Sequence, residues 1–323
     1  MIKILAIAKR FVVASPPVAF TIRWSKKFHP PGFQGIPLYD VVKFFFQQVQ
    51  KIGMVERASA ISFNIVMAIP PAIIFLFTLI PFLPISKQFI AEMYGLIREV
   101  IPGQKQNSSL IKFLNDFLTR PRNDLLSLGF ILALFYSSNA MMGIMRSFDK
   151  NYIGFRKRKG LSQRGVALKL TLILFLLVFL SIIALVAQGA VLNFLGVKNV
   201  TVKSFIHNVR WVVIVLLFFY IISFIYRHAP SVDKKWRLVN PGSILATILM
   251  LLFTFLFSYW VNNFGNYNKL YGSIGTIMVL MLLIYFNSLV LLIGFELNVS
   301  INSLKIIAMN RQEEERKNAA LNG

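Results

Sequence analysis

The 323-residue chain contains no cysteine, only three histidines and only 12 acidic residues. Without cysteine, this chain has no disulfide, no thiol nucleophile and no thiolate-ligated metal site. His29, His207 and His228 lie in different predicted loops and the acids are dispersed, so neither residue type predicts a hydrolytic metal centre. The HExxH, GxSxG, Walker and dinucleotide-binding motifs are also absent. We therefore predict no enzyme, no cofactor and no metal site.

Long apolar runs dominate what is present. Hydrophobic residues make up 56% of the chain and charged residues only 15%. About 20 consecutive apolar residues suffice to cross a bilayer as a helix, and six stretches reach or approach this length. The pattern predicts an all-α integral membrane protein built as a bundle of six transmembrane helices. We expect the spans at about residues 58–83, 124–145, 166–192, 210–226, 241–261 and 271–303.

The segments outside these spans differ in character. Residues 1–37 are basic and rich in proline, which predicts an uncleaved cytoplasmic segment lying on the membrane. Residues 38–50 carry their apolar side chains on one broad face, which predicts an interfacial amphipathic helix or a partly buried packing helix. Residues 84–123 contain two short amphipathic stretches and predict a short helical periplasmic segment. Residues 304–323 form a predicted cytoplasmic tail, whose polar end after Asn310 should fray.

The net charge of +23 is distributed unevenly. The N-terminal region, the loops after the second and fourth spans, and the tail carry more than twice as many Lys and Arg residues as the opposite side. The positive-inside rule then places both termini in the cytoplasm. The same charges predict contacts with membrane lipids, and with anionic headgroups at the cytoplasmic face, rather than with nucleic acid. The oligomeric state is left open.

The last apolar run, residues 271–303, carries a single acid, Glu296. Helical spacing places Glu296 on one stripe of this span, whereas Asn287, Gly294 and Asn298 fall on the opposite side. A helix with polar groups on two sides does not face lipid all round, so we expect it at the centre of the bundle.

Polar residues within other spans are costly to bury without partners and are therefore candidate site residues. Arg57 and Asn64, seven residues apart, share a face of the first span, as Asn139 and Arg146 do in the second. We expect Glu296 to pair with Arg57 or Arg146 near the cytoplasmic side. The pair is either static and fixes helix register, or part of a polar vestibule that binds an anionic headgroup or relays a proton. The candidate polar cluster comprises Arg57, Asn64, Asn139, Arg146, Glu296 and Asn298.

Three segments resemble the YihY/BrkB family of bacterial inner-membrane proteins. They are ASAISFNIVMAIPPAIIFLFTLIPFLP in the first span with its approach GIPLYDVVKFFFQQVQKIGMVERA, YRHAPSVD after the fourth, and LYGSIGTIMVLMLLIYFNSLVLLIGFELN in the last. The sequence departs from the family pattern at Pro70-Pro71, where a single proline is usual. The resemblance implies a six-helix membrane domain over residues 38–303, both termini inside, and a plasma-membrane location.

The resemblance implies no settled activity. Members were once assigned as a tRNA-processing ribonuclease, which is now regarded as mistaken, and others have been linked to serum resistance or to export of lipid or lipopolysaccharide precursors. We therefore expect transport or flipping of a lipid-like or amphipathic envelope molecule. A membrane scaffold for envelope assembly and a membrane-bound hydrolase or ribonuclease are the alternatives.

Overall fold

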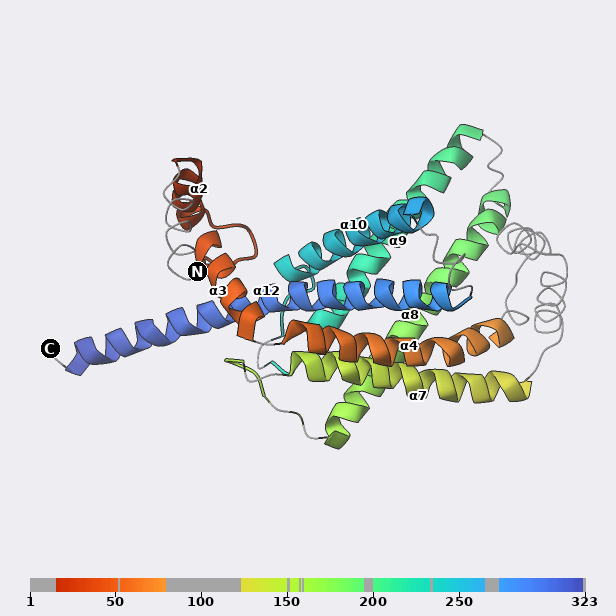
Figure 1. The fold of residues 1–323 in the computed structure, drawn as a ribbon, viewed down its shortest axis with the longest axis horizontal. Coiled ribbons are helices and arrows are strands. Elements are labelled where there is room, and N and C mark those ends of the chain that lie inside the picture. Colours follow the sequence, from red (N-terminus) through yellow and green to blue (C-terminus); the bar gives the residue numbers. More distant parts are fainter. Residues whose placement is uncertain are drawn as a thin grey trace. The chain divides into compact units, whose positions relative to one another are not determined.

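Long helices make up most of the described structure. The computed structural model describes residues 16–51, 53–79, 123–149, 152–156, 158, 160–194, 200–232, 235–264 and 273–321. Within these ranges there is no strand, only an isolated antiparallel bridge between Phe155 and Val232, so the predicted all-α class is confirmed. In chain order the helices are α2 (Pro16–Lys27), α3 (Leu38–Lys51), α4 (Met54–Leu79), α7 (Asn123–Phe148), α8 (Gly160–Phe194), α9 (Val200–His228), α10 (Pro241–Phe264) and α12 (Ser273–Leu321) (Figure 1).

Several of these helices can cross a membrane, which makes the chain a multi-pass membrane protein. In the described part of the chain, five are long and apolar enough, and they match the first, second, third, fifth and sixth predicted spans. The fourth predicted span falls in α9, whose apolar stretch Val212–His228 is shorter. Residues 1–15 lie outside the described residues, and so does the predicted periplasmic segment except for Asn123, where α7 begins. The five candidate spans are Met54–Leu76, Leu126–Phe148, Gly160–Ser181, Pro241–Val261 and Ile277–Ala320.

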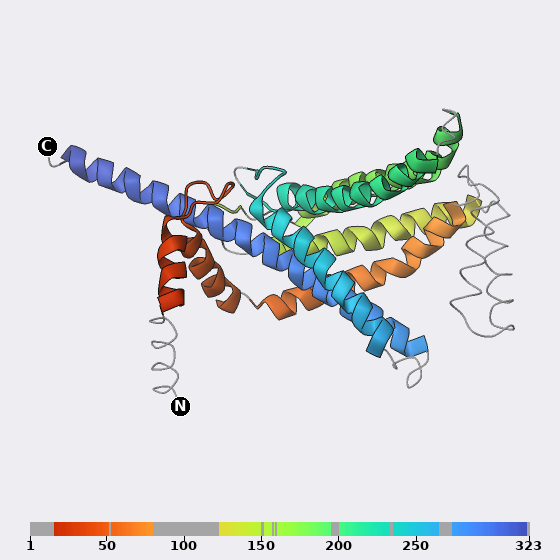
Figure 2. The same cartoon turned by 90° about the horizontal axis from the view of Figure 1, so that it is seen from above.

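The chain divides into two compact units, which are described separately. The first comprises residues 1–59, 148–157 and 222–323, and the second comprises residues 60–147 and 158–221. Helix α12 is the central element of the first unit. Helix α10 lies along α12, α3 packs against α12, and α2 packs against α3 (Figures 1 and 2).

Two glycines let the backbones of α10 and α12 approach closely. A Cβ atom added to Gly242 would lie 2.1 Å from the carbonyl oxygen of Gly294, and one added to Gly294 would lie 2.5 Å from that of Gly242. Helix α10 begins here because Asn240 is a good N-cap and Pro241 suits the first helical position. The Asn240 side-chain oxygen accepts a hydrogen bond from the Ser243 N–H at 2.8 Å.

The predicted helix at residues 38–50 is present as α3, and one face of it is buried. Val41 is fully buried and packs with Phe33 and with Ile301 of α12, whereas Phe46 is 59% exposed. The sequence pattern does not predict helix α2, because proline breaks a helix anywhere beyond its first turn. Pro16 and Pro17 instead occupy its first two positions, where the missing N–H groups have no helical acceptor.

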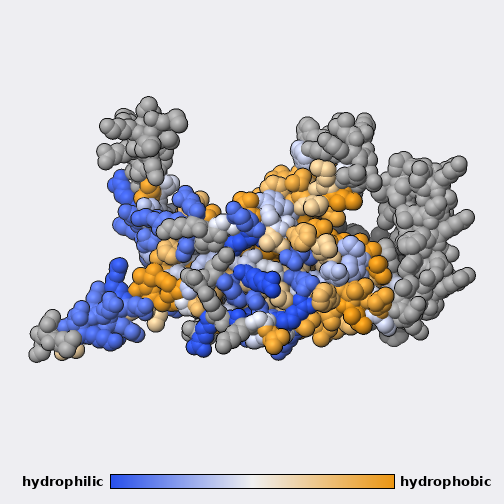
Figure 3. Space-filling view, turned by 60° about the horizontal axis from the view of Figure 1, so that its bottom comes forward, coloured by the Kyte–Doolittle hydropathy of each residue, from blue (hydrophilic) through white to orange (hydrophobic). Residues whose placement is uncertain are grey.

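The expectation that the chain frays after Asn310 is wrong, because α12 continues to Leu321. This stretch consists mostly of good helix formers. It also places Arg311 with Glu315, and Glu313 with Lys317, at the four-residue spacing at which opposite charges support a helix. Figure 3 shows hydrophilic residues covering this end of α12, at the lower left.

In the second unit, α4, α7 and α8 contribute apolar and aromatic contacts. The Phe75 ring lies 5.4 Å from that of Phe130 and 6.4 Å from that of Phe175, between centroids. Gly129 of α7 lets the α4 backbone approach, since a Cβ there would lie 3.4 Å from the Phe75 Cα. Large apolar side chains such as Ile131 remain exposed on the helices, which suits helices surrounded by lipid.

Replacing Gly294 with alanine should destabilise the protein by about 1–3 kcal/mol, because the added methyl group overpacks the α10–α12 contact. A Cβ at Gly294 would also lie 2.6 Å from the Tyr226 hydroxyl oxygen. The measurement is the midpoint of thermal unfolding of purified protein in detergent. Gly165→Ala in α8 is the matched control, since a Cβ there meets no atom within 4 Å. An unchanged midpoint for Gly294→Ala would contradict the close approach of these backbones.

Candidate functional site

A buried ion pair joins α12 to the first turn of α4. Glu296 of α12 has no exposed side-chain surface and Arg57 of α4 has 5%. Arg57 Nη1 donates a hydrogen bond to Glu296 Oε1 at 2.7 Å. The sequence predicts either Arg57 or Arg146 as the partner of Glu296, and in the structure the partner is Arg57. Either charge alone would be costly to bury at this position, so each residue depends on the other.

Tyr152, in the segment after α7, completes the cluster. Its hydroxyl donates a second hydrogen bond to Glu296 Oε1, at 2.5 Å. Tyr152 lies outside the candidate spans, and burial, reinforced by the charge of Glu296, raises its pKa well above the ordinary value. The phenol therefore stays protonated and donates throughout the neutral pH range. We did not predict this residue, because a lone loop tyrosine carries no signal of burial.

The second carboxylate oxygen of Glu296 is less well supported. Glu296 Oε2 is buried, and no hydrogen-bond partner for it lies among the residues that the structure describes. Buried carboxylate oxygens normally accept hydrogen bonds, so an atom of this kind requires an explanation. It marks Glu296 as the candidate centre of function.

Aromatic rings surround the residue next to Glu296. The Phe295 ring stacks on Phe148 at 3.8 Å between centroids, and Trp236, Tyr152 and Tyr226 lie 5.5, 6.1 and 6.3 Å away. This apolar shell excludes water and lowers the local dielectric constant, which strengthens the attraction within the ion pair. The same shell raises the cost of leaving either charge unpaired.

Backbone contacts hold the Tyr152 segment in place. The Arg156 N–H donates to the Ser231 carbonyl at 2.8 Å, next to the bridge between Phe155 and Val232. The Ser231 N–H in turn donates to Asp149 Oδ1 at 3.2 Å. The sequence YRHAPSVD, noted for its family resemblance, thus supplies the strand-like partner that positions Tyr152.

Asn298, also predicted as a site residue, has a structural role at the start of α10. Its Oδ1 accepts from the Gly242 N–H at 2.9 Å, and its Nδ2 donates to Asn240 Oδ1 at 2.6 Å. It therefore satisfies one of the amide groups that a helix N-terminus leaves without a partner. It lies on the side of α12 opposite Glu296, as the helical spacing predicts.

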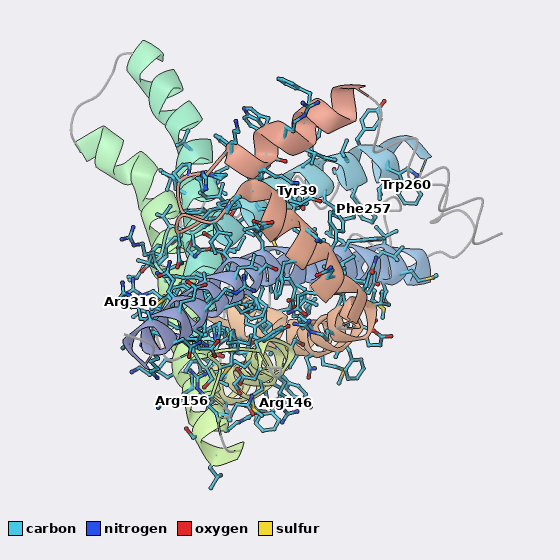
Figure 4. All side chains as sticks on the ribbon, turned by 90° about the vertical axis from the view of Figure 1, so that its left-hand side faces the viewer. Tyr39, Arg146, Arg156, Phe257, Trp260 and Arg316 are labelled. Carbon is cyan, nitrogen blue, oxygen red and sulfur yellow. The ribbon has the colours of Figure 1, made fainter. Side chains whose placement is uncertain are left out.

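The remaining predicted site residues belong to the second unit. Asn64 donates to the carbonyl of Ala60 in its own helix at 2.7 Å. Asn139 accepts a hydrogen bond from Arg164 of α8, which was not predicted. Arg146, labelled in Figure 4, is exposed on α7. Among the described residues, no group of three or more His, Asp or Glu side chains is placed to hold a metal ion.

The fold and this polar centre define a multi-pass helical membrane protein with a charged cluster buried among its apolar helices. The model of the family described as Virulence factor BrkB matches residues 45–320. The chain therefore belongs to the BrkB family. The resemblance noted in the sequence is thus confirmed.

The chain is also similar to individual proteins from three bacteria. The chain is 28% identical over 255 residues to the ribonuclease-like protein YfkH of Bacillus subtilis (strain 168). The aligned residues make up 77% of this chain and 90% of YfkH. It is 32% identical over 98 residues to the UPF0761 membrane protein IL2447 of Idiomarina loihiensis, covering 30% of this chain and 34% of that protein. A third match is the UPF0761 membrane protein Smlt0865 of Stenotrophomonas maltophilia, 31% identical over 91 residues, 28% of this chain and 22% of that protein. No solved structure matches the chain.

Breaking the ion pair from either side should destabilise the protein strongly. Arg57→Gln or Glu296→Gln leaves one buried charge without its partner, which costs about 3–5 kcal/mol. The double variant should lose less than the sum of the two, because neither charge remains. The measurement is the thermal unfolding midpoint of the three variants in detergent. Arg146→Gln is the control and should unfold like the wild type. Additive losses in the double variant would show that the two side chains do not interact.

Proposed function

We propose that this chain is an inner-membrane transporter or flippase for a lipid-like or amphipathic envelope molecule. The observation that carries the proposal is the buried Glu296, whose Oε1 takes both described donors while Oε2 has none among the described residues. Ionisable residues inside membrane helices are rare and commonly mark substrate or ion pathways and proton relays.

The chemistry of the cluster suits an anionic headgroup. An arginine guanidinium has five N–H donors in a planar fork that matches the oxygens of a phosphate or carboxylate. A headgroup that reaches Arg57 would compete with Glu296 for these donors. Binding would then separate α12 from the start of α4, and Tyr152 would remain as a donor to the released carboxylate. Substrate recognition and helix movement would be coupled in this way.

A membrane scaffold for envelope assembly is the second candidate. The observation in its favour is the near-complete burial of Arg57 and Glu296, which suits a static pair that fixes helix register. The ribonuclease-like name of YfkH raises a membrane-bound hydrolase as a third alternative. No cluster of acids or histidines suited to this role is found in the described residues.

The proposed topology has six spans with both termini in the cytoplasm. Helix α9 supplies the fourth span in this arrangement, and α3 lies at the cytoplasmic interface. The basic residues gathered on the cytoplasmic side then contact anionic lipid headgroups.

Cysteine labelling tests the orientation directly, because the chain has no cysteine of its own. A membrane-impermeant maleimide applied to intact cells should not label Arg156→Cys or Asn310→Cys until the membrane is permeabilised. It should label Asn266→Cys, between the fifth and sixth predicted spans, without permeabilisation. Labelling of Asn310→Cys in intact cells would overturn the proposed orientation.

Transport itself can be measured with purified protein in liposomes that contain fluorescent phospholipid in one leaflet. Glu296→Gln should reduce the initial rate of transfer roughly ten- to hundredfold, the effect expected for loss of one charge-assisted hydrogen bond. Arg146→Gln is the matched control and should transport like the wild type. A folded Glu296→Gln protein with the wild-type rate would exclude Glu296 from the mechanism, and wild-type protein without activity would favour the scaffold.

A further inference from the structure

Helix α2 exposes three aromatic side chains on one stripe. Phe20, Trp24 and Phe28 follow each other at four-residue intervals and are 69%, 52% and 39% exposed. Phe28 continues the helical turn, since its N–H donates to the Trp24 carbonyl at 3.0 Å. The rings of Trp24 and Phe28 stack with centroids 4.5 Å apart. A continuous aromatic surface of this kind indicates an apolar or partly apolar partner.

Basic side chains accompany this stripe. Arg23 and Lys27 are also four residues apart, so helical spacing places them on the neighbouring stripe of α2. Both are exposed, and α2 contains no acid. Lys26 is directed to α3 instead, where its Nζ lies 5.1 Å from the centroid of the Tyr39 ring; Tyr39 is labelled in Figure 4. One side of α2 thus holds α3, and another presents aromatic rings beside positive charges.

The pair formed by α2 and α3 is attached where two candidate spans begin. Helix α3 ends at Lys51, and the span-length helix α4 begins at Met54. The loop between α2 and α3 contacts the first residue of α10, because a Cβ on Gly32 would lie 3.0 Å from Pro241 Cγ. Both α4 and α10 are long and apolar enough to cross a membrane, so we expect helices fixed to their N-terminal ends to lie at the bilayer surface.

We propose that Phe20, Trp24 and Phe28, together with Arg23 and Lys27, form a binding site for anionic phospholipid headgroups. The bilayer is the one that the chain itself spans, on the side where α4 and α10 begin. Tryptophan and phenylalanine enter the headgroup level of a membrane, and each neighbouring Lys or Arg adds attraction to an acidic surface. The positive charge of α2 suits the acidic headgroups, and its exposed aromatic rings suit the partly apolar layer beneath them. The inference requires a membrane-spanning chain and does not depend on transport.

A nitroxide attached to Phe20→Cys in the full chain tests the proposal, because no other cysteine is present. The protein is placed in bilayers of phosphatidylcholine alone or of equal parts phosphatidylcholine and phosphatidylglycerol. In the anionic bilayer we expect the label to be accessible to oxygen and protected from a water-soluble nickel complex. In phosphatidylcholine alone the protection should decrease.

The charge contribution is isolated by Arg23→Gln/Lys27→Gln in the same labelled protein. This change should weaken attachment in the anionic bilayer by roughly thirtyfold, from the attraction expected for two basic residues. Arg311→Gln/Lys317→Gln, on the exposed end of α12, removes the same charge and should leave the label protected. Equal exposure of the label to nickel in both bilayers would overturn the proposal. So would protection in detergent that increases with protein concentration, because a second copy would then cover this face.

Discussion

The hydrogen-bonded ion pair between Arg57 and Glu296 is the constraint on which the first unit depends. Each charge has left water almost completely, and their separation of 2.7 Å is what makes that burial tolerable. The pair links residues 239 positions apart in the sequence, so the start of α4 cannot slide along α12 without exposing one charge to an aromatic shell. Tyr152 adds a neutral hydrogen-bond donor that stabilises the negative charge on the same oxygen, Glu296 Oε1. Helix register and a buried polar centre thus follow from one contact.

On the opposite side of α12 the same register is enforced by shape and by amide hydrogen bonds. Gly242 and Gly294 allow a backbone contact that no side chain would permit. Asn298 then reaches the first turn of α10 and accepts one of its N–H groups. Lipid provides no hydrophobic driving force for helix association, so membrane helices need other contacts. Here small residues allow the two backbones to approach closely, and a side chain accepts a hydrogen bond from an N–H group at the helix end. Helix α12 is central because it carries charge on one side and this contact on the other.

The sequence predicts the helical class and the span-length helices well, because apolar length is a one-dimensional property. The sequence also reduces the candidate partners of Glu296 to two arginines, because both are expected at the same depth in the membrane. Seven-residue spacing, however, shows only which residues share a face of one helix. The rotation of each helix toward its neighbours decides between Arg57 and Arg146, and that is a tertiary property. Tyr152 could not be predicted, since its position depends on a tertiary contact of its segment, the hydrogen bond from the Arg156 N–H to the Ser231 carbonyl. Proline and a high density of charge usually indicate irregular chain, so the sequence predicts neither helix α2 nor the helical end of α12. Proline is compatible with the first positions of a helix, and charges of opposite sign four residues apart support one.

The hydrogen-bond donors around Glu296 are distributed unevenly between its two carboxylate oxygens. A static pair is most stable when both carboxylate oxygens are bonded, because each unmet oxygen in an apolar shell keeps its full desolvation cost. Here two donors converge on Oε1 while Oε2 is buried without a partner among the described residues. Such an arrangement is less stable than one with the donors shared, so a group that brings a hydrogen-bond donor to Oε2 would be stabilised there. This unused capacity at Oε2 is the physical basis of our proposal that the cluster responds to a ligand or to a change in helix position; a fixed support would gain nothing from it.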